Sequence, residues 1–352
     1  MSARVRFAPS PSGSLHLGNA LTAVANRTFA DDHSGVLVLR VDDTDPGRVV
    51  RGGEEAILVD LRWLGVRWDE GPVRQSGRTR HYAAAAERAL AGGGAERDSD
   101  GSVRLRGSTL LRADGSATYQ LASVVDDLEL GITHVIRGSD HRPNEELQRS
   151  IARAVGGELP EVIHHGLLLG ADGKKLSKRA GHSSIADLRA EGVPATAVRA
   201  YLDELGLPRH DVRLDLARLG RLAIDAIAAM TDEELCAAAG APVGLARALR
   251  GARTLVEARE IARQIETPDP VSLGADARPT LERFVELRGG AGERLDEAAA
   301  RAILRELKAV GGDLKSLRLA LTGAERGPEL WTVVAALGAG EAERRAQAAS
   351  AG

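Results

Sequence analysis

The sequence predicts a Rossmann-type α/β domain followed by an all-α C-terminal region, and three observations lead to this prediction. Short apolar strands alternate with helical segments up to about residue 185, which is typical of a parallel sheet with helices between its strands. Beyond about Ile185, helical periodicity dominates. Two glycine-containing segments with histidine or lysine side chains each follow a strand of the first half, where phosphate groups commonly bind.

The first half of the chain supplies the alternating elements. The turn-rich segment Pro9–Ser14 separates the first strand from the first helix, and Ala91–Gly101 has the small and polar residues of a loop or a trimmed insertion. In order, we expect a strand at Val5–Ala8, a helix from His16 to about Asp32, a strand at Val36–Val41, helices at Gly52–Leu64 and Tyr82–Leu90, strands at Ser123–Val125 and Thr133–Ile136, a helix at Asn144–Val155 and a strand at Val162–Leu169.

The second half is expected to be mostly helical. Helical spacing runs on to Leu205 and returns at Leu216–Met230, Asp232–Ala239 and Leu245–Ile265. Breaks rich in proline or glycine at 267–270 and 289–292 indicate joints between helical subdomains. The predicted domains are a Rossmann-type domain at 1–185 with a shortened insertion at about 83–118, a helical domain at 186–245 and a second helical domain at 246–352.

Composition narrows the class of protein. With 352 residues and 43% hydrophobic content, the chain can bury the cores of two or three domains. No segment approaches about 18 uninterrupted apolar residues and the first residues lack a signal-peptide pattern, so we expect a soluble, cytoplasmic protein with no membrane partner. The single cysteine, Cys236, excludes an internal disulfide and a cysteine-rich zinc site. The formal net charge of -3 gives no electrostatic argument for nucleic acid.

The first candidate site is His16-Leu17-Gly18-Asn19, where a strand and a proline-rich loop meet the start of a helix. A helix N-terminus offers free backbone N–H groups to phosphate, glycine permits close approach, and an imidazole can donate to a phosphate oxygen. A histidine at a helix start is also a common cap or surface residue, so this motif alone leaves both interpretations open.

The second candidate site is the glycine-rich segment GADGKKLSKR at 170–179, which follows a buried strand. The chain has only five lysines among its 47 basic residues, and three of the five, Lys174, Lys175 and Lys178, lie here. Because arginine serves as the cation elsewhere, the cluster indicates a site that needs compact ammonium groups. Lysines on a flexible loop can close over a triphosphate and neutralise the charge that develops as pyrophosphate leaves. A solvated basic turn is the alternative.

Together, the HLG motif after APSPSG and the later KLSKR resemble the two signature motifs of class I aminoacyl-tRNA synthetases, and the glutamyl branch is the most similar. Other segments that resemble this branch are Arg6–Gly13, Asp43–Asp45 with Arg48, Trp63–Gly65 with Trp68–Pro72, Val125–Asp127, Gly131–Gly138, Asp140-His141 and the tail from Ala320 to Leu330. The resemblance spans nearly the whole chain. It implies a helical region that contacts the tRNA stem (186–245) and the anticodon (246–352).

The resemblance also implies roles for individual residues. Arg6 and Arg137 would hold the side-chain carboxylate of the substrate, a task that suits two arginines, although an ordinary ion pair is the alternative for Arg137. The implied amino-acid-binding set is Arg6, Ala8, Ser10, Asp42, Tyr119, Gln120 and Arg137. The implied ATP-binding set is His16, Gly18, Asn19, Leu168, Lys175, Ser177 and Lys178, of which His16, Lys175 and Lys178 would be catalytic. Mg²⁺ would share the charge of ATP, and neither zinc nor another protein-bound metal is expected.

Four departures from the family pattern lie around the amino acid and the tRNA end. Asp42 replaces the family's glutamate, which contacts the α-amino group of the substrate, and so withdraws the carboxylate by about 1–1.5 Å. Gln120 replaces an asparagine, and Ser139 replaces the glutamate of a GEDH motif. The insertion that embraces the tRNA acceptor end in the family is much shortened between Tyr82 and Tyr119. These departures concern substrate choice rather than activation chemistry.

The favoured function is activation of glutamate and its transfer to tRNA, because the retained helical region suits a large acceptor. The resemblance also implies a monomer, since members of the family are usually monomeric. One alternative is a paralogue that transfers glutamate or a related amino acid to a modified tRNA base or a small molecule. Glutamyl-queuosine tRNA synthetases are of this kind, but they normally lack the C-terminal region that this chain keeps. The other alternative is a non-catalytic tRNA-binding paralogue, against which His16, Lys175 and Lys178 argue.

Overall fold

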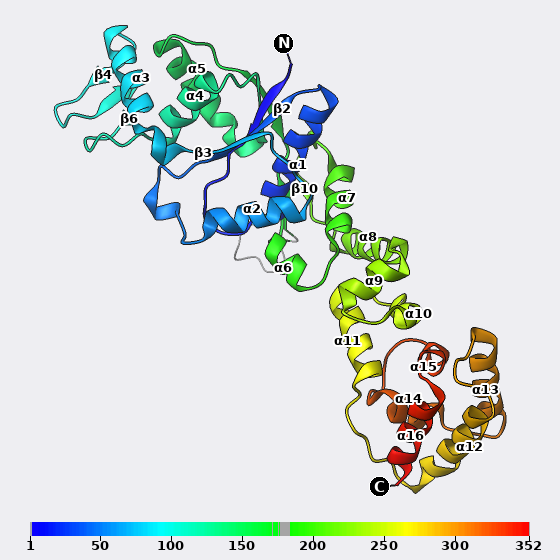
Figure 1. Ribbon diagram of the computed structural model, residues 1–352. Coiled ribbons are helices and arrows are strands. Elements are labelled where there is room, and N and C mark those ends of the chain that lie inside the picture. Colours follow the sequence, from blue (N-terminus) through cyan, green and yellow to red (C-terminus); the bar gives the residue numbers. More distant parts are fainter. Residues whose placement is uncertain (1, 171, 175, 177–183, 352) are drawn as a thin grey trace. The chain divides into compact units, whose positions relative to one another are not determined.

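The computed structural model describes residues 2–170, 172–174, 176 and 184–351. The chain divides into two compact units. The first comprises the chain up to Arg189 together with Val198–Leu219, and the second comprises Ala190–Ala197 together with the chain from Gly220 onward. Parallel strands alternate with helices in the first unit, and the described part of the second is helical, so the predicted fold class is confirmed (Figure 1). The division into three domains stays a prediction.

Parallel strands form the base of the first unit. β1 (Arg4–Phe7), β2 (Val36–Val41) and β3 (Glu70–Arg74) form a sheet in the order β1-β2-β3, and β7 (His134–Gly138) pairs in parallel with β8 (Glu161–His165). β1 lies beside β7, where the Thr133 N–H donates to the Arg4 carbonyl oxygen at 2.8 Å. Ligands of open α/β sheets bind beyond the carboxyl ends of such strands.

Helices connect these strands. The connections include α1 (Leu17–Asp32) between β1 and β2, α2 (Gly53–Trp63) between β2 and β3, and α5 (Glu145–Ala154) between β7 and β8. α1 begins after His16, whose Nδ1 accepts the Asn19 N–H at 3.2 Å and caps the helix. The buried residues of α1 include Leu17, Leu21 and Val24. They are three or four residues apart, so they lie on one face of the helix, which points inward.

The segment between β3 and β7 contains the short insertion and one wrong prediction. It forms α3 (Thr79–Ala91), the antiparallel strands β4 (Glu96–Arg97), β5 (Val103–Leu105) and β6 (Ser108–Leu111), and α4 (Tyr119–Glu129). The strand predicted at Ser123–Val125 is wrong, because these residues lie inside α4. α4 packs against both α3 and α5, so its apolar residues are buried on more than one face and the helical period is hidden.

The strand predicted at Val162–Leu169 is interrupted. β8 ends at His165, and β9 (Leu168–Leu169) pairs instead with β10 (Val212–Arg213). The Gly166 N–H donates to the Pro208 carbonyl oxygen at 2.6 Å, and a Cβ at Gly166 would lie 2.0 Å from the His210 carbonyl oxygen. Only glycine permits this close approach of two backbones, which separates β8 from β9.

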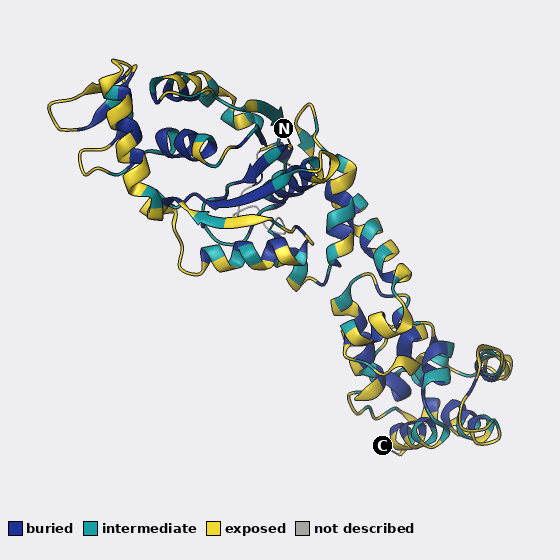
Figure 2. Ribbon diagram, turned by 45° about the horizontal axis from the view of Figure 1, so that its top comes forward, coloured by how far each residue is buried: buried dark blue, intermediate teal, exposed yellow. Residues whose placement is uncertain are grey.

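Helices dominate after Ile185, with short 3₁₀ turns here and in the first unit. The helices are α6 (Ile185–Ala190), α7 (Ala195–Leu205), α8 (Leu216–Ala229), α9 (Asp232–Ala239), α10 (Ala246–Leu249), α11 (Leu255–Glu266), α12 (Arg278–Gly289), α13 (Glu297–Ala309), α14 (Leu314–Thr322), α15 (Leu330–Ala336) and α16 (Ala339–Ser350). The 3₁₀ turns are η1 (Pro46–Arg48), η2 (Gln75–Arg78), η3 (Ser139–Asn144), η4 (Val243–Leu245) and η5 (Ala275–Ala277). Figure 2 shows the buried helix faces of the second unit in dark blue.

The single helix predicted at Leu245–Ile265 is wrong, because its residues form α10 and α11. Thr254 caps α11 by accepting the Glu257 N–H at its Oγ1, at 3.1 Å. A threonine followed three residues later by glutamate is a helix-start signal, and it outweighs the continuous apolar spacing. None of the described helices is both long enough and apolar enough to cross a lipid bilayer.

Candidate active site

A pocket opens beyond the carboxyl ends of β1, β2, β7 and β8 in the first unit, with a cavity of about 260 Å³. It brings together most of the predicted site residues, namely Arg6, Ala8, Ser10, Asp42, Tyr119, Arg137, His16, Gly18, Asn19 and Leu168. Gln120 is not part of the lining. Lys175, Ser177 and Lys178 lie outside the described residues, so their predicted roles stay predictions.

Arg137, near the end of β7, is a buried cation held by neutral partners. Its Nη1 donates to Oε1 of Gln148 at 2.8 Å, and its Nε donates to Nε2 of His164 at 3.3 Å. Its Nη2 is buried and has no hydrogen-bond partner. Burial away from water lowers the pKa of Arg137 from its ordinary value. A buried guanidinium with an unsatisfied N–H group favours an anionic ligand, since pairing removes a desolvation cost.

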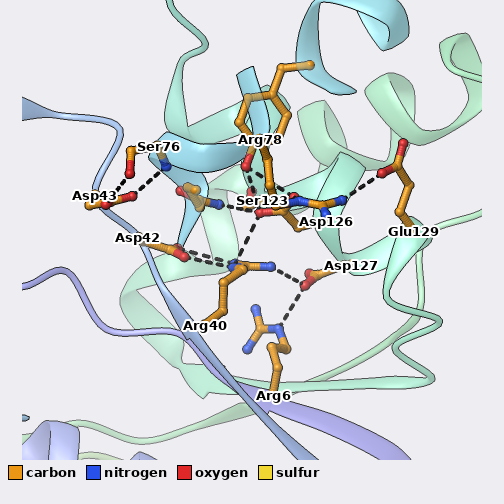
Figure 3. Close-up of polar contacts among 12 residues, drawn as sticks. Arg6, Arg40, Asp42, Asp43, Ser76, Arg78, Ser123, Asp126, Asp127 and Glu129 are labelled. Atoms are coloured by element: carbon orange, nitrogen blue, oxygen red, sulfur yellow. Dashed lines mark hydrogen bonds and ion pairs between the residues drawn. The ribbon is translucent and has the colours of Figure 1, made fainter. Parts of the chain in front are cut away.

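Arg6 and Arg40 form a network with two aspartates, Asp42 and Asp127 (Figure 3). Arg40 is 1% exposed and donates to both oxygens of Asp42, through Nε at 2.7 Å and Nη2 at 3.2 Å. Oδ1 of Asp127 accepts from Nη1 of Arg40 at 2.7 Å and from Nε of Arg6 at 3.2 Å. The carboxylates raise the pKa of Arg40 well above its ordinary value although burial opposes this. The fold therefore neutralises Arg40 internally.

Asp42 occupies the place predicted to contact the substrate's α-amino group. Its side chain is 7% exposed and lines the pocket. Desolvation raises the pKa of Asp42, against the opposing influence of Arg40 and Arg6. Because Arg40 holds both carboxylate oxygens, Asp42 is fixed in position and can present only its remaining lone pairs to a ligand.

Asp126 joins this network to the start of the insertion (Figure 3). It is fully buried and accepts from Nε2 of Gln75 at 2.8 Å, from Nε of Arg78 at 2.7 Å and from the hydroxyl of Tyr82 at 3.0 Å. Its Oδ2 also lies 3.7 Å from Nε of Arg40. Burial, together with the adjacent Asp126 carboxylate, raises the pKa of Tyr82. Asp126 therefore ties the segment leading into the insertion to α4.

The start of α4 places Tyr119 and Gln120 differently. The hydroxyl of Tyr119 lies 3.2 Å from Nδ1 of His141, and both residues line the pocket. Nε2 of Gln120 donates to Oδ1 of Asn144 at 2.9 Å, away from the pocket lining. Tyr119 and His141 can therefore contact a ligand directly, whereas Gln120 connects α4 to the end of η3.

The start of α1 forms the other side of the pocket. His16 caps the helix, and Gly18 and Asn19 follow in its first turn. A Cβ at Gly18 would lie 3.1 Å from the ring atoms Cε1 and Nδ1 of His16 and 4.0 Å from Cβ of Leu168. Glycine therefore keeps the space between His16 and Leu168 open, beside the positive end of the helix dipole, as binding of a phosphate-bearing ligand requires.

Sequence reasoning assigned no role to Arg40, Asp127, Gln148 or His164. For Arg40 and Asp127 a signal was present, because a charged residue inside an apolar strand or helix must be paired. For Gln148 and His164 the signal was weak, because a polar residue on a predicted helix or strand is usually exposed. Among the described residues, no group of three or more His, Cys, Asp or Glu side chains is arranged to hold a metal ion.

Comparison with known proteins identifies relatives along the whole chain. The family model described as tRNA synthetases class I (E and Q), catalytic domain, matches residues 2–109 and 102–222. The chain is 37% identical to glutamate–tRNA ligase 1 of Rubrobacter xylanophilus over 426 residues, covering 99% of this chain and 98% of that protein. It is 32% identical to glutamate–tRNA ligase 2 of Paracoccus denitrificans, covering 97% of each. The first alignment exceeds the 352 residues of this chain, so that relative contains residues without a counterpart here.

Solved structures show the same fold. A crystal structure of a glutamate tRNA ligase from Elizabethkingia meningosepticum, in complex with its amino acid, matches with a TM-score of 0.78 and 21% identity over 99% of both chains. The glutamate-tRNA synthetase of Elizabethkingia anophelis matches with a TM-score of 0.75 and 22% identity over 99% of this chain and all of that one. From the family model and the sequence identity along its length, the chain belongs to the glutamate and glutamine branch of the class I aminoacyl-tRNA synthetases.

Proposed function

We propose that this protein uses ATP to activate glutamate and transfers the glutamyl group to tRNA, the activity for which its relatives are named. One observation carries the proposal: the buried, unsatisfied Nη2 of Arg137 belongs to a pocket that also contains Arg6 and the His16 end of α1. The pocket thus combines a receptor for an acidic side chain with a place for a phosphate group.

Selection of glutamate follows from charge. The carboxylate of glutamate can pair with Arg137 and Arg6 through charge-assisted hydrogen bonds. The amide of glutamine has similar size but no charge, so it would leave the buried guanidinium of Arg137 without a counter-charge. The carboxylate of Asp42 and the ring of Tyr119 line the same pocket and would orient the α-amino end of the substrate.

Activation needs no protein base, because the α-carboxylate of glutamate is already ionised. One of its oxygens forms a bond to the α-phosphorus of ATP while the bond from that phosphorus to the bridging oxygen breaks, and pyrophosphate leaves with the electron pair. The chain's contribution is positioning and electrostatic stabilisation. His16 and the first turn of α1 would hold the phosphates, and the lysines of segment 170–179 would neutralise the charge that develops as pyrophosphate leaves.

Mg²⁺ would reach the site as the ATP complex and share the charge of the phosphates. The described residues contain no cluster of carboxylates or histidines to hold the ion by themselves, so the phosphates would supply most of its ligands. In the second step, the terminal ribose hydroxyl of tRNA would attack the glutamyl carbonyl and displace AMP, and its proton would pass to a phosphate oxygen of the departing AMP. We also propose that the protein is cytoplasmic and monomeric. Size-exclusion chromatography with light scattering tests the monomeric state.

ATP–pyrophosphate exchange tests this function. Each amino acid is supplied in turn, with and without total tRNA, and the Arg137→Ala variant serves as the control. We expect exchange with glutamate, loss of that exchange in Arg137→Ala, and glutamylation of tRNA by the wild type. Exchange with a different amino acid, or with glutamate but without glutamylated tRNA as a product, would identify a repurposed activating enzyme. Binding of tRNA without any exchange would identify a non-catalytic paralogue.

A further inference from the structure

Arg6 and Arg137, which both line the pocket, are held by partners of different charge. Arg6 donates its Nε–H to a carboxylate, that of Asp127. Arg137 donates instead to two uncharged acceptors, Oε1 of Gln148 and Nε2 of His164. Among the described residues Arg137 forms no ion pair, and its Nη2 has no partner. The two cations therefore differ in how far the fold neutralises them.

Gln148, on α5, is oriented by a chain of hydrogen bonds from α4. The Ser123 hydroxyl donates to the Gln120 carbonyl oxygen at 3.4 Å and accepts from Nε2 of Gln148 at 3.4 Å. Since Ser123 occupies the amide nitrogen of Gln148, the amide oxygen faces Arg137, at 2.8 Å. Gln148 and Ser123 are each 2% exposed, so this arrangement is closed to water.

His164, at the β8 position paired with Arg137, can accept from Arg137 only while its ring is neutral. Burial lowers the pKa of His164, and the nearby charge of Arg137 lowers it further. Arg142 and His165 act in the same direction, whereas Glu145, whose Oε2 lies 3.7 Å from Nδ1 of His164, raises the pKa. The neutral ring is therefore favoured, with its proton on Nδ1.

Neutral support has a consequence for the ligand. A carboxylate at either supporting position would pair with Arg137 inside the protein and satisfy its charge before a substrate arrived. Gln148 and His164 fix the guanidinium in place without doing so. The charge of Arg137 is then matched when the ligand brings a carboxylate to the pocket.

We infer that Gln148 and His164 are positioning residues that determine which substrate charge the pocket selects. They hold Arg137 with uncharged acceptors, so its charge remains available for the substrate's side-chain carboxylate. This inference rests on the proposed activation of glutamate. It assigns a specificity role to two residues that do not themselves line the pocket.

The decisive variant is Gln148→Glu, which keeps the size of the side chain and adds a charge. In ATP–pyrophosphate exchange with tRNA present, we expect the KM for glutamate to rise at least about 30-fold, since a charge-assisted contact is lost. The KM for ATP should stay within about threefold of wild type, because the His16 end of the pocket is unchanged. The ratio of kcat/KM for glutamate to that for glutamine should fall, a change that mere loosening of the structure would not produce.

Gln148→Met is the matched control, because it removes the acceptor without adding charge. It should raise the KM for glutamate less than Gln148→Glu does and keep the preference for glutamate over glutamine. His164→Glu provides the acid from another element and should behave like Gln148→Glu if that variant does not fold. A wild-type KM and a wild-type preference for glutamate in a folded Gln148→Glu or His164→Glu variant would overturn this inference but not the proposed function. Failure of the wild type to exchange with glutamate would instead overturn the proposed function.

Discussion

Arg40 and Arg137 lie on the two strands that flank β1, and they show how the same side chain serves opposite purposes. Both are buried, at 1% and 6% exposure. Arg40 is bound by the carboxylates of Asp42 and Asp127, and its pKa is raised. Arg137 is bound by an amide and an imidazole, and its pKa is lowered. Arg40 therefore has carboxylates as hydrogen-bond partners, whereas the hydrogen-bond acceptors of Arg137 are uncharged.

This difference assigns these two arginines of the pocket to different purposes: Arg40 to the stability of the fold and Arg137 to ligand binding. A buried cation whose counter-charges come from the protein stabilises the fold, because removing it leaves buried carboxylates unpaired. A buried cation without a counter-charge costs stability and is retained for a ligand. Arg6 is intermediate, since it lines the pocket and also donates to Asp127.

The largest effect should come from Arg40→Met. We expect the free energy of unfolding of the first unit to fall by about 3–5 kcal/mol, because Asp42 and Asp127 would lose their buried counter-charge. Urea denaturation followed by tryptophan fluorescence measures this in a Trp331→Phe background, where Trp63 and Trp68 report on the first unit alone. A loss below about 1 kcal/mol would show that the Arg40 network is not a stability element.

The second effect concerns Arg137→Met and should have the opposite character. We expect kcat/KM for glutamate to fall at least about 100-fold, since a buried charge-assisted interaction with the substrate is lost. The free energy of unfolding should change by less than about 1 kcal/mol, because an uncompensated buried charge is removed. Equal losses of stability in Arg40→Met and Arg137→Met would erase the distinction between the two arginines.

Two neighbouring aspartates sharpen the comparison further. Asp126→Asn should cost about 2–3 kcal/mol of stability, because Arg78 and Gln75 lose a charged acceptor, and should leave the KM for glutamate within about threefold of wild type. Asp127→Asn should raise that KM about tenfold, because Arg6 loses the carboxylate that fixes it. Exchange kinetics and denaturation of both variants test this. A larger change in KM for Asp126→Asn than for Asp127→Asn would contradict the assignment of Asp127 to the substrate site and of Asp126 to stability.

The smallest effect is a dependence of stability on pH. Burial lowers the pKa of both His164 and His165 below the ordinary value of 6.5. The unfolded chain therefore takes up protons first, and stability should fall as the pH drops from 6.5 toward the folded-state pKa values. The KM for glutamate should rise only at the lower end of this interval and below it, where His164 of the folded protein itself becomes protonated and repels Arg137. Denaturation and ATP–pyrophosphate exchange measured as the pH is lowered test both changes. His164→Gln is the control, because it removes the contribution of His164 to each of them.

Local signals in the sequence were sufficient for much of the fold. The run VLVLRV predicted the strand Val36–Val41 with its observed bounds, and His16 was predicted at the helix start that it caps. α4 was missed in part because burial on several faces hides the helical period around Ser123–Val125. The break between α10 and α11 depended on the cap at Thr254, which the apolar spacing concealed.

The site was predictable where a motif marked it and not where long-range packing made it. Arg6 and Arg137 were found through family resemblance, and the structure brings them to one pocket. The hydrogen-bond partners of the Asp126 side chain lie 44 to 51 residues away in the sequence, and no local pattern connects them to α4. The role of the Gln148 amide follows only from its contacts with Arg137 and Ser123, which the sequence does not reveal.

The most direct test of the account is the ratio of kcat/KM for glutamate to that for glutamine in ATP–pyrophosphate exchange by the wild-type protein with tRNA present. The two substrates differ little in size, so the ratio reports how strongly the pocket demands a negative charge. An uncompensated Arg137 predicts a preference for glutamate of at least about 100-fold. Comparable exchange with both amino acids would contradict the claim that Arg137 is reserved for a carboxylate.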